Sequence, residues 1–276
     1  MRFDAYAGNV SGSSPEDVAL MVAFANKARV ERGRPRGRYH DVFEVRDGHE
    51  GIGWVGHDQQ LDTAFFEFKG ATTPDCAAAI RKHWPAAHTV SRLDSCEDFN
   101  EPGCYGGLVG LVDRCIDPRV KSKQIAPRLG ADDGTTTYWG STTSRVMVRC
   151  YEAGKMKERR HFGRPDWVRV EAQVRPGKAM EKLAAAQVSP LEAWGWSAWS
   201  RRVAEAIGQV EVPRFAPPAC AQEFDKTTLY LARAFRKHWE TMLEDFGSWE
   251  CIGRELAAVW AQEDQAAEAQ VARAKR

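Results

Sequence analysis

The sequence predicts an α+β protein, in which an antiparallel sheet carries helices on one face and is followed by a C-terminal helical layer. Two observations lead to this fold class. Short stretches of alternating apolar and polar residues recur between residues 2 and 175. From Pro176 onward the composition shifts to alanine, tryptophan and glutamate. We therefore expect an α+β domain at residues 1–175 and a helical region at residues 176–276 that packs on it.

The first elements form a strand, a helix and then three strands. Residues 2–8 alternate well enough for a strand. Residues 14–17, Ser-Pro-Glu-Asp, supply an N-cap, a proline at the first helical position and a carboxylate at the third, so a helix follows. Beyond a basic segment, residues 41–45 and 52–55 are predicted to pair around a turn, and residues 63–69 to form a third strand.

A second helix starts at residues 73–76, Thr-Pro-Asp-Cys, and is ended by Pro85. The strand at residues 91–99 comes next, and its period of two places three side chains on one face: Asp94, Cys96 and Asp98. The remaining elements of this part are a helix at residues 105–116 and strands at residues 135–140, 144–151 and 166–174. The strand-to-helix units near residues 3–26 and 63–84 suggest an internally duplicated fold.

The C-terminal region is predicted to be helical on both sides of a proline-rich linker. Residues 189–192, Ser-Pro-Leu-Glu, begin a helix. That helix carries Trp194, Trp196 and Trp199, and the linker contains Pro213, Pro217 and Pro218. Helical spacing relates Leu231, Phe235, Trp239, Met242 and Phe246, and then Trp249, Ile252, Leu256 and Val259. We interpret these aromatic residues as packing, because platforms that stack single-stranded bases usually lie on sheets or loops.

Composition limits the class of protein. Hydrophobic residues make up 43% of the chain and charged residues 28%, with a net charge of +1. No apolar stretch approaches the roughly 20 residues that a membrane span needs, so we expect a cytoplasmic protein without a membrane partner. The seven cysteines never form a C-x-x-C pair, which argues against a disulfide framework and a zinc knuckle.

One segment is strongly basic despite the neutral total. Six cations fall within twelve residues, interrupted by glycine and proline: Lys27, Arg29, Arg32, Arg34, Arg36 and Arg38. A segment of this kind can follow the phosphates of DNA, with an affinity that salt weakens. The alternative is a solvated loop on an ordinary surface.

A tyrosine near the end of one predicted strand is a candidate nucleophile. Strand geometry points Arg149 and Tyr151 to the same face, and Lys155 follows four residues later. Positive charge at this distance favours the phenolate, which is the nucleophilic form of a tyrosine. The alternative is a half-buried tyrosine with a packing role.

Carboxylates on neighbouring strands form the second candidate group. Asp94 and Asp98 lie on one face of the strand at residues 91–99, and Glu171 lies on the strand at residues 166–174. Carboxylate oxygens are the ligands that Mg²⁺ and Mn²⁺ prefer, so the three could form a metal site. They could equally form a surface ladder in which each is paired with an arginine.

These residues together resemble the replication initiation factor family, the trans-acting rolling-circle replication initiators of plasmids and phages. The similarity covers about residues 2–175. It consists of an Arg-hydrophobic-Asp strand that ends in Asp-Phe, a Tyr-aromatic-Gly-Ser block, a Ser-x-x-x-x-Arg-hydrophobic-Tyr strand and a Trp-hydrophobic-Arg-hydrophobic-Glu strand. The matching residues are Arg92, Asp94, Asp98, Phe99, Tyr138, Gly140, Ser141, Ser144, Arg149, Tyr151, Trp167, Arg169 and Glu171.

The resemblance implies a metal-dependent nicking-joining enzyme. It implies that Tyr151, or failing that Tyr138, attacks one DNA strand to leave a 5′-phosphotyrosine and a free 3′-hydroxyl. The same resemblance assigns Mg²⁺ or Mn²⁺ to the three carboxylates, and assigns phosphate stabilisation to Arg149, Arg169 and Lys155. The implied partners are an origin duplex or hairpin, the single strand after nicking, a host helicase and a second copy of the chain in a homodimer.

Two departures from the family pattern keep other functions open. Ala153 stands where a lysine usually follows the tyrosine and its acidic neighbour. There is also no His-hydrophobic-His pair, which excludes the metal site of histidine-rich nickases. The loss of the lysine favours a catalytically inactive DNA-binding protein that acts as a repressor or origin-binding factor. A third possibility is an interaction protein whose helical region mediates assembly.

Overall fold

The computed structural model describes residues 1–48, 50–127, 133–215, 236–248 and 251–254 of the chain. The chain forms two compact units, Met1–Ala219 and Cys220–Arg276. The expected domain boundary after residue 175 therefore falls inside the first unit. Within the second unit, the structure describes the helix α8 (Arg236–Phe246) and residues around it. Of the predicted apolar positions, Leu231, Phe235, Trp249, Leu256 and Val259 lie outside the described residues.

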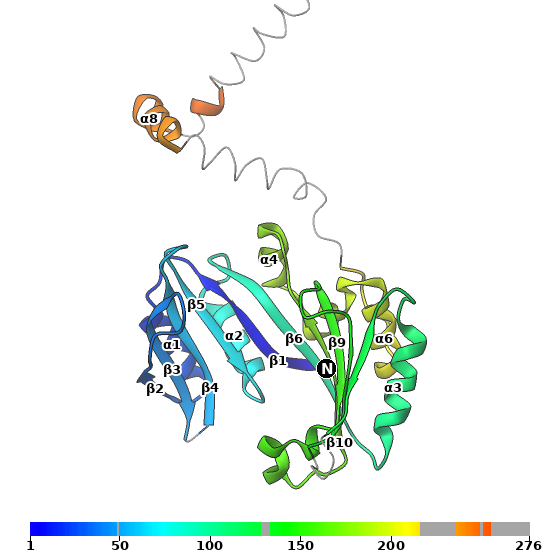
Figure 1. Cartoon of the computed structure of the whole chain (residues 1–276). Coiled ribbons are helices and arrows are strands. Elements are labelled where there is room, and N and C mark those ends of the chain that lie inside the picture. The colour runs from blue at the N-terminus through cyan, green and yellow to red at the C-terminus, as the bar shows by residue number, and fades with distance from the viewer. Residues whose placement is uncertain (49, 128–132, 216–235, 249–250, 255–276) are drawn as a thin grey trace, which may run out of the picture. The chain divides into compact units, whose positions relative to one another are not determined.

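One ten-stranded sheet organises the described part of the first unit (Figure 1). In chain order its strands are β1 (Arg2–Val10), β2 (Arg29–Arg32), β3 (Tyr39–Asp47), β4 (Glu50–Asp58), β5 (Thr63–Lys69), β6 (His88–Asn100), β7 (Ser122–Ile125), β8 (Thr136–Trp139), β9 (Val146–Tyr151) and β10 (Trp167–Val174). Across the sheet they run β2-β3-β4-β5-β1-β6-β10-β9-β8-β7, and every neighbouring pair is antiparallel. The predicted α+β fold with an antiparallel sheet is confirmed.

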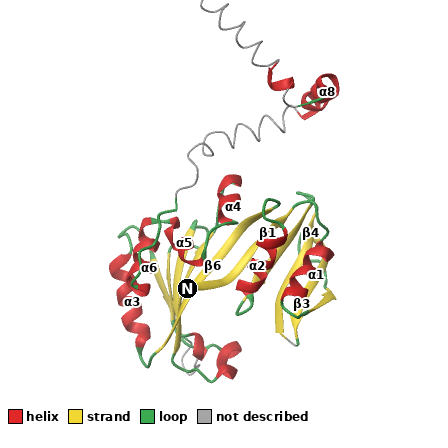
Figure 2. Ribbon diagram, turned by 180° about the vertical axis from the view of Figure 1, so that it is seen from behind, coloured by secondary structure: helices red, strands yellow, loops and turns green. Residues whose placement is uncertain are grey.

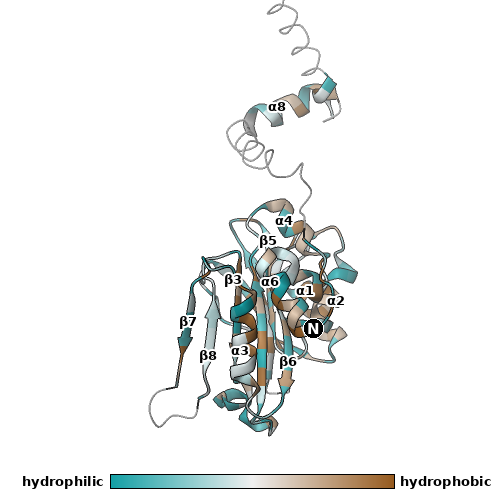
Figure 3. Ribbon diagram, turned by 90° about the vertical axis from the view of Figure 1, so that its right-hand side faces the viewer, coloured by the Kyte–Doolittle hydropathy of each residue, from teal (hydrophilic) through white to brown (hydrophobic). Residues whose placement is uncertain are grey.

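Helices cover one face of this sheet (Figure 2). They are α1 (Pro15–Ala25), α2 (Thr73–His83), α3 (Cys104–Cys115), α4 (Ala179–Ala185), α5 (Pro190–Ala193) and α6 (Ala198–Gly208). Helices α1 and α2 pack on the strands from β3 to β1, while α4 and α5 pack on β6. Helix α3 packs on β9 and β10, and α6 packs in turn on α3 (Figure 3). The apolar core lies between the helices and this face, and none of the described helices has the length and apolar character to cross a membrane.

The sheet consists of two halves with the same order of elements. The first half runs β1-α1-β2-β3-β4-β5-α2, and the second runs β6-α3-β7-β8-β9-β10-α4. Strands β1 and β6 lie side by side at the centre, and the other strands of each half extend outward in matching order. The expected duplication is therefore present as topology. Its unit is an entire half, however, because the predicted repeats at residues 3–26 and 63–84 both fall within the first half.

Three elements differ from expectation for identifiable reasons. The helix predicted from Ser189 is broken into α5, the 3₁₀ turn η3 (Trp194–Trp196) and α6. The backbone at Pro213 packs directly against Gly195, because a Cβ on Gly195 would lie 2.1 Å from the carbonyl oxygen of Pro213. A residue with a side chain would not fit at this position. Ser197 then caps α6 by accepting a hydrogen bond from the backbone N–H of Ser200. The short edge strands β2 and β7 were not predicted, because exposed polar residues on both faces hide the alternation.

The face of the sheet opposite the helices, here called the open face, carries most of the polar side chains of β6, β9 and β10. Two 3₁₀ turns between β9 and β10, η1 (Ala153–Lys155) and η2 (Lys157–Phe162), lie on this side. The buried side chains of Tyr151, Ala153 and Trp167 form a small apolar cluster beneath them. The predicted catalytic and metal-binding residues of β6, β9 and β10 lie on this open face.

Candidate functional site

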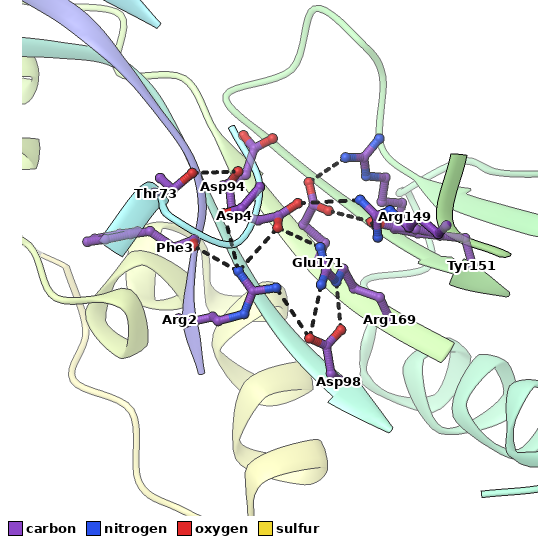
Figure 4. Close-up of polar contacts among 12 residues, drawn as sticks. Arg2, Phe3, Asp4, Thr73, Asp94, Asp98, Arg149, Tyr151, Arg169 and Glu171 are labelled. Carbon is purple, nitrogen blue, oxygen red and sulfur yellow. Dashed lines mark hydrogen bonds and ion pairs between the residues drawn. The ribbon is translucent and has the colours of Figure 1, made fainter. Parts of the chain in front are cut away.

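Strand alternation brings the predicted side chains together at the centre of the open face. Strand β10 lies between β6 and β9, so that Arg169 is opposite both Asp98 and Tyr151. Two residues further along β10, Glu171 is opposite Arg149. The predictions that Asp94 and Asp98 share a face, and that Arg149 and Tyr151 share a face, agree with this register. Figure 4 shows the resulting network.

Arg169 is the centre of one group of contacts in this network. Its side chain is 1% exposed, and its Nε and Nη2 atoms donate to the two carboxylate oxygens of Asp98 at 2.6 and 2.9 Å. Its Nη1 atom donates to Oδ1 of Asp4 at 2.5 Å, and Trp167 Nε1 donates to Asp98 at 2.7 Å. Burial opposes the charge on Asp98, but the hydrogen bonds and charge of Arg169 hold the pKa of this carboxyl below its usual value.

Tyr151 is the centre of the second group of contacts in the network. Its side chain is 2% exposed, and its hydroxyl donates to Oε2 of Glu171 at 3.1 Å. Arg159 Nη1 donates to the same hydroxyl at 3.2 Å, and Arg149 Nη2 donates to Oε1 of Glu171 at 2.6 Å. Burial and the negative charge of Glu171 raise the pKa of Tyr151 well above its ordinary value, despite three nearby arginines. Burial and the contact with Glu171 thus favour the neutral phenol, in contrast to the expectation that the arginines favour the phenolate.

Glu171 is the acceptor for that phenol. It is completely buried, and burial raises its pKa to about 7, with Asp94 and Asp4 raising it further and Arg149 opposing them. A carboxyl group that titrates near neutral pH can take a proton from a bound hydroxyl and return it later. The Tyr151 hydroxyl thus lies within hydrogen-bond distance of a carboxyl that can accept its proton.

The three predicted metal carboxylates lie on the expected strands and face, but each is held by a different arginine. Arg169 binds Asp98, Arg149 binds Glu171, and Arg92 binds Asp94, which also accepts from Gln173 Nε2 at 3.1 Å. Among the described residues, no three aspartate, glutamate, histidine or cysteine side chains converge as metal ligands would. This donor set does not fit a preformed Mg²⁺ or Mn²⁺ site, and a ladder of arginine-carboxylate pairs describes it better.

Tyr138 occupies a different environment from Tyr151. It lies on β8 opposite Arg149, which places its side chain on the open face as well. Tyr138 is partly exposed, whereas Tyr151 is buried. No described residue hydrogen-bonds to the Tyr138 hydroxyl, in contrast to the two partners that hold Tyr151. The two candidate nucleophiles therefore differ in access and in orientation.

A cleft of about 410 Å³ opens beside the network. Its walls are the turns after β3 and β5, the turn η2 and the start of β10. Arg2, Asp4 and Arg169 form its inner side, and Arg159 separates it from the Tyr151 hydroxyl. Lys69, His161, Phe162 and Trp167 add cationic and aromatic groups to the lining. A polyanion with planar bases could approach the network from this side.

The basic segment of residues 27–38 forms the edge strand β2 and the loop that follows it. Its arginines pair with nearby acids: Arg29 with Glu31, Arg32 with Asp41, Arg36 with Glu44 and Arg38 with Asp58. Lys27 and Arg34 are exposed. Much of the positive charge expected to follow phosphates is thus balanced within the first half, and DNA binding by this segment stays a prediction.

Sequence reasoning missed several members of the network. Asp4 binds Arg169, Arg2 reaches Asp98 at 3.4 Å, and Arg159 takes the place near Tyr151 that was predicted for Lys155. A signal for Asp4 existed, because the first strand places Arg2 and Asp4 on one face. Lys155 lies 2.8 Å from Glu152, its i−3 neighbour. The sequence alone could not show that Arg159, and not Lys155, lies beside the Tyr151 hydroxyl, because this depends on the path of the chain through η1 and η2.

Comparison with known proteins identifies the fold. No protein-family model matches the sequence, and no curated protein matches it. Among solved structures, the chain is similar to the rolling-circle replication initiator protein from Geobacillus stearothermophilus, with a TM-score of 0.50 and 16% sequence identity. The similarity covers 78% of this chain and 98% of that one. The sheet and its helices thus have the fold of a rolling-circle replication initiator.

Proposed function

We propose that this protein initiates rolling-circle replication as a DNA nicking-joining enzyme that cleaves one strand of an origin through a tyrosine. The fold supports this function in general terms. The observation that carries it is the position of the Tyr151 hydroxyl, which lies between the carboxylate of Glu171 and the guanidinium of Arg159 on the open face. That arrangement supplies a nucleophile, a base and a cation for a phosphoryl transfer.

In the proposed reaction the Tyr151 oxygen attacks the scissile phosphorus. Glu171 accepts the phenolic proton as the new tyrosine-phosphorus bond forms, and the bond from phosphorus to the 3′-oxygen breaks. The released 3′-oxygen takes up a proton from water and becomes a free 3′-hydroxyl, while the 5′-phosphate stays on the tyrosine. Arg159 and Arg149 are close enough to the hydroxyl to offset negative charge on the phosphate. Rejoining is the reverse of these steps.

Access to Tyr151 requires a change in η2. The hydroxyl is buried, and Arg159 stands between it and the cleft. A DNA phosphate that enters the cleft offers Arg159 a stronger partner than a neutral phenol, since charge-assisted hydrogen bonds are the stronger kind. We therefore expect Arg159 to turn from the tyrosine to the phosphate when DNA binds, which uncovers the nucleophile.

Tyr138 stays the alternative nucleophile. Its partial exposure would let a strand reach it without any movement of η2, and Arg149 lies opposite it on β9. It has no carboxylate partner among the described residues, so a base would have to come from elsewhere. Single Tyr→Phe variants distinguish the two, because each removes one hydroxyl oxygen and little else.

The metal requirement and the protein partners stay predictions. No step above passes through Mg²⁺ or Mn²⁺, because Asp94, Asp98 and Glu171 are each bound to an arginine instead of converging. The expected DNA ligands are an origin duplex or hairpin and then the nicked single strand. A host helicase and a homodimer are expected from the resemblance alone.

The test is incubation of the full chain with supercoiled DNA of its own replicon, with Mg²⁺, Mn²⁺ or a chelator. Open circles and a covalent protein-DNA band on a denaturing gel are scored for wild type, Tyr151→Phe and Tyr138→Phe. Tyr105→Phe is the matched control, since the Tyr105 hydroxyl bonds to Thr137 on the helix side. We expect Tyr151→Phe to abolish nicking and the control to retain it.

The second candidate is a catalytically inactive DNA-binding protein of the same fold, a repressor or origin-binding factor. The burial of Tyr151 and the replacement of the family's lysine by Ala153 favour it. This candidate predicts salt-sensitive binding to the origin without nicking in the presence of either metal ion. Wild-type protein that binds the replicon but never opens the circle would establish it in place of the nickase.

A further inference from the structure

Three aromatic rings lie together on the open face of the first half. Tyr39, Trp54 and Phe65 come from β3, β4 and β5. Their strand neighbours Val55 and Phe66 belong to the core beneath the helices, so alternation turns the three rings to the open face. The ring centroids of Tyr39 and Phe65 are 4.5 Å apart at an interplanar angle of 23°, and Trp54 lies 5.1 Å from Phe65.

Two arginines of the basic segment lie over these rings. The guanidinium carbon of Arg36 is 4.9 Å from the ring centroid of Trp54, and that of Arg38 is 5.2 Å from the ring centroid of Tyr39. Tyr39 and Phe65 are partly exposed, while Trp54 is 8% exposed and donates to Glu67 at 3.0 Å. The outer faces of the cluster are thus covered by planar cations from a loop instead of by the core.

Partly exposed rings on a sheet, flanked by arginines, are the features that bind single-stranded nucleic acid without sequence preference. A base can stack on a ring face that a guanidinium now covers, because both groups are planar. The arginines can then bind the phosphates that flank the base. The stacked pair of Trp196 and Phe215 differs, because it lies in the helical layer and packs beside the core.

Charge on this surface sets the expected salt dependence. Glu44 accepts from Arg36 at 2.7 Å and from Arg46 at 2.6 Å, so a DNA phosphate competes with a carboxylate for these cations. Arg38 pairs with Asp58 in the same way. Affinity should therefore come mainly from stacking, with a modest contribution from phosphate contacts.

We propose that Tyr39, Trp54 and Phe65, together with Arg36 and Arg38, form a base-stacking subsite for single-stranded DNA. The inference rests on the proposed function for the identity of its ligand, the strand that continues from the nick. Strands β4 and β9 are five inter-strand spacings apart, roughly 24 Å along the sheet, so one short DNA strand can reach both the rings and Tyr151. Duplex DNA is a poorer ligand for it, since paired bases are already stacked.

The test measures the affinity of the full chain for a fluorescent oligothymidylate and for an oligonucleotide of equal length whose central positions are abasic. The variants are Tyr39→Ala and Phe65→Ala. Phe24→Ala is the control, because Phe24 is 85% exposed on α1, on the helix side. Tyr39→Ala and Phe65→Ala should each weaken binding of the oligothymidylate by at least about fivefold and leave binding of the abasic oligonucleotide nearly unchanged. Phe24→Ala should change neither affinity.

Further variants separate stacking from misfolding and from charge. Tyr39→Trp keeps a stacking ring and should bind nearly as tightly as wild type, whereas Tyr39→Leu should behave like Tyr39→Ala. Arg36→Gln and Arg38→Gln should each lower the salt dependence of binding by about one phosphate contact or less. Equal losses on the abasic strand, or equal losses in Tyr39→Trp and Tyr39→Leu, would overturn the subsite.

The same preparations are assayed for nicking, so that the two proposals can fail separately. Unchanged oligothymidylate affinity in both alanine variants, with wild type still nicking, disproves the subsite alone. Wild-type protein that never nicks disproves the nickase. If stacking-dependent binding persists in that case, it supports a single-strand binding surface on a non-cleaving protein.

Discussion

The two halves of the sheet share one topology but present different chemistry on the open face. In the first half that face carries the rings of Tyr39, Trp54 and Phe65. In the second half it carries arginine-carboxylate pairs around Tyr151. The helix-side faces of both halves are apolar and packed. The two halves thus place different side chains on the same face of one fold: aromatic rings in the first half, and buried arginine-carboxylate pairs around a tyrosine in the second.

The halves also differ in what the loss of one side chain should cost. The second half buries charged groups, and such groups are tolerated only while every one is paired. The Arg36–Glu44 pair of the first half is partly exposed, with side-chain exposures of 44% and 22%. A partly exposed pair is screened by water and contributes little.

The largest effect is expected from Arg169→Ala. Asp98 and Asp4 would be left without their main partner in a buried setting, and the free energy of unfolding should fall by about 3–5 kcal/mol. Urea denaturation followed by circular dichroism measures this change. Arg36→Ala in the first half is the matched control, with an expected loss of about 1 kcal/mol or less. Equal losses in the two variants would mean that the halves do not differ as proposed.

Glu171→Gln should lower the rate of nicking by about 10²-fold or more, since it removes the base but keeps the size of the side chain. Single-turnover nicking of supercoiled replicon DNA measures the rate. Glu44→Gln, the same substitution in the first half, is the control and should nick at the wild-type rate. A Glu171→Gln rate within a few-fold of wild type would remove Glu171 from the reaction.

The pH dependence of stability should have opposite signs at two carboxyls of the second half. Burial raises the folded-state pKa of Glu171 to about 7, so its protonated form favours folding. Wild type should therefore lose stability relative to Glu171→Gln as pH rises from about 4.5 to about 7. The pKa of Asp98 is lowered by Arg169, so wild type should lose stability relative to Asp98→Asn as pH falls below about 4. Thermal unfolding across pH 3–8 checks both signs, and a shared sign would contradict the assignment.

The smallest effect is expected from Arg32→Gln in the first half. Arg32 and Asp41 form a pair whose side chains are 76% and 59% exposed. Removing it should change the free energy of unfolding by about 0.5 kcal/mol or less. Urea denaturation measures this as well, and a loss of several kcal/mol would show that the edge of the first half depends on charge pairing.

Strand alternation made much of this site predictable from the sequence. It placed Asp94 with Asp98 and Arg149 with Tyr151 correctly, because a period of two needs no knowledge of tertiary contacts. The partners across strands could not be read in the same way. Asp98 and Glu171 face Arg169 and Arg149 through the register of β6, β10 and β9, which the lengths of the turns did not reveal. Asp94 is bound by Arg92 of its own strand. The raised pKa of Tyr151 could not be read from the sequence either, since it depends on burial and on the neighbouring Glu171.

The aromatic residues of the helical layer and those of the open face also differ in how far the sequence predicted their position. Helical spacing in the C-terminal region correctly indicated packing for Trp194 and Trp199, which contact the apolar core. The rings of Tyr39, Trp54 and Phe65 are far apart in sequence, and only the pairing of β3, β4 and β5 brings them together. A predicted hairpin fixed two of these strands, but not which faces of them would stay open.

The most direct test of the account is to map the covalent adduct. Wild-type protein is reacted with an origin strand that cannot be rejoined, digested with trypsin and analysed by mass spectrometry. Cleavage after Arg149 and Lys155 gives a peptide of residues 150–155 that contains Tyr151, whereas Tyr138 lies in the peptide that ends at Arg145. We predict a 5′-nucleotidyl adduct on the peptide of residues 150–155. An adduct on the Tyr138 peptide, or none on either, would contradict the pairing of Tyr151 with Glu171 as the nicking centre.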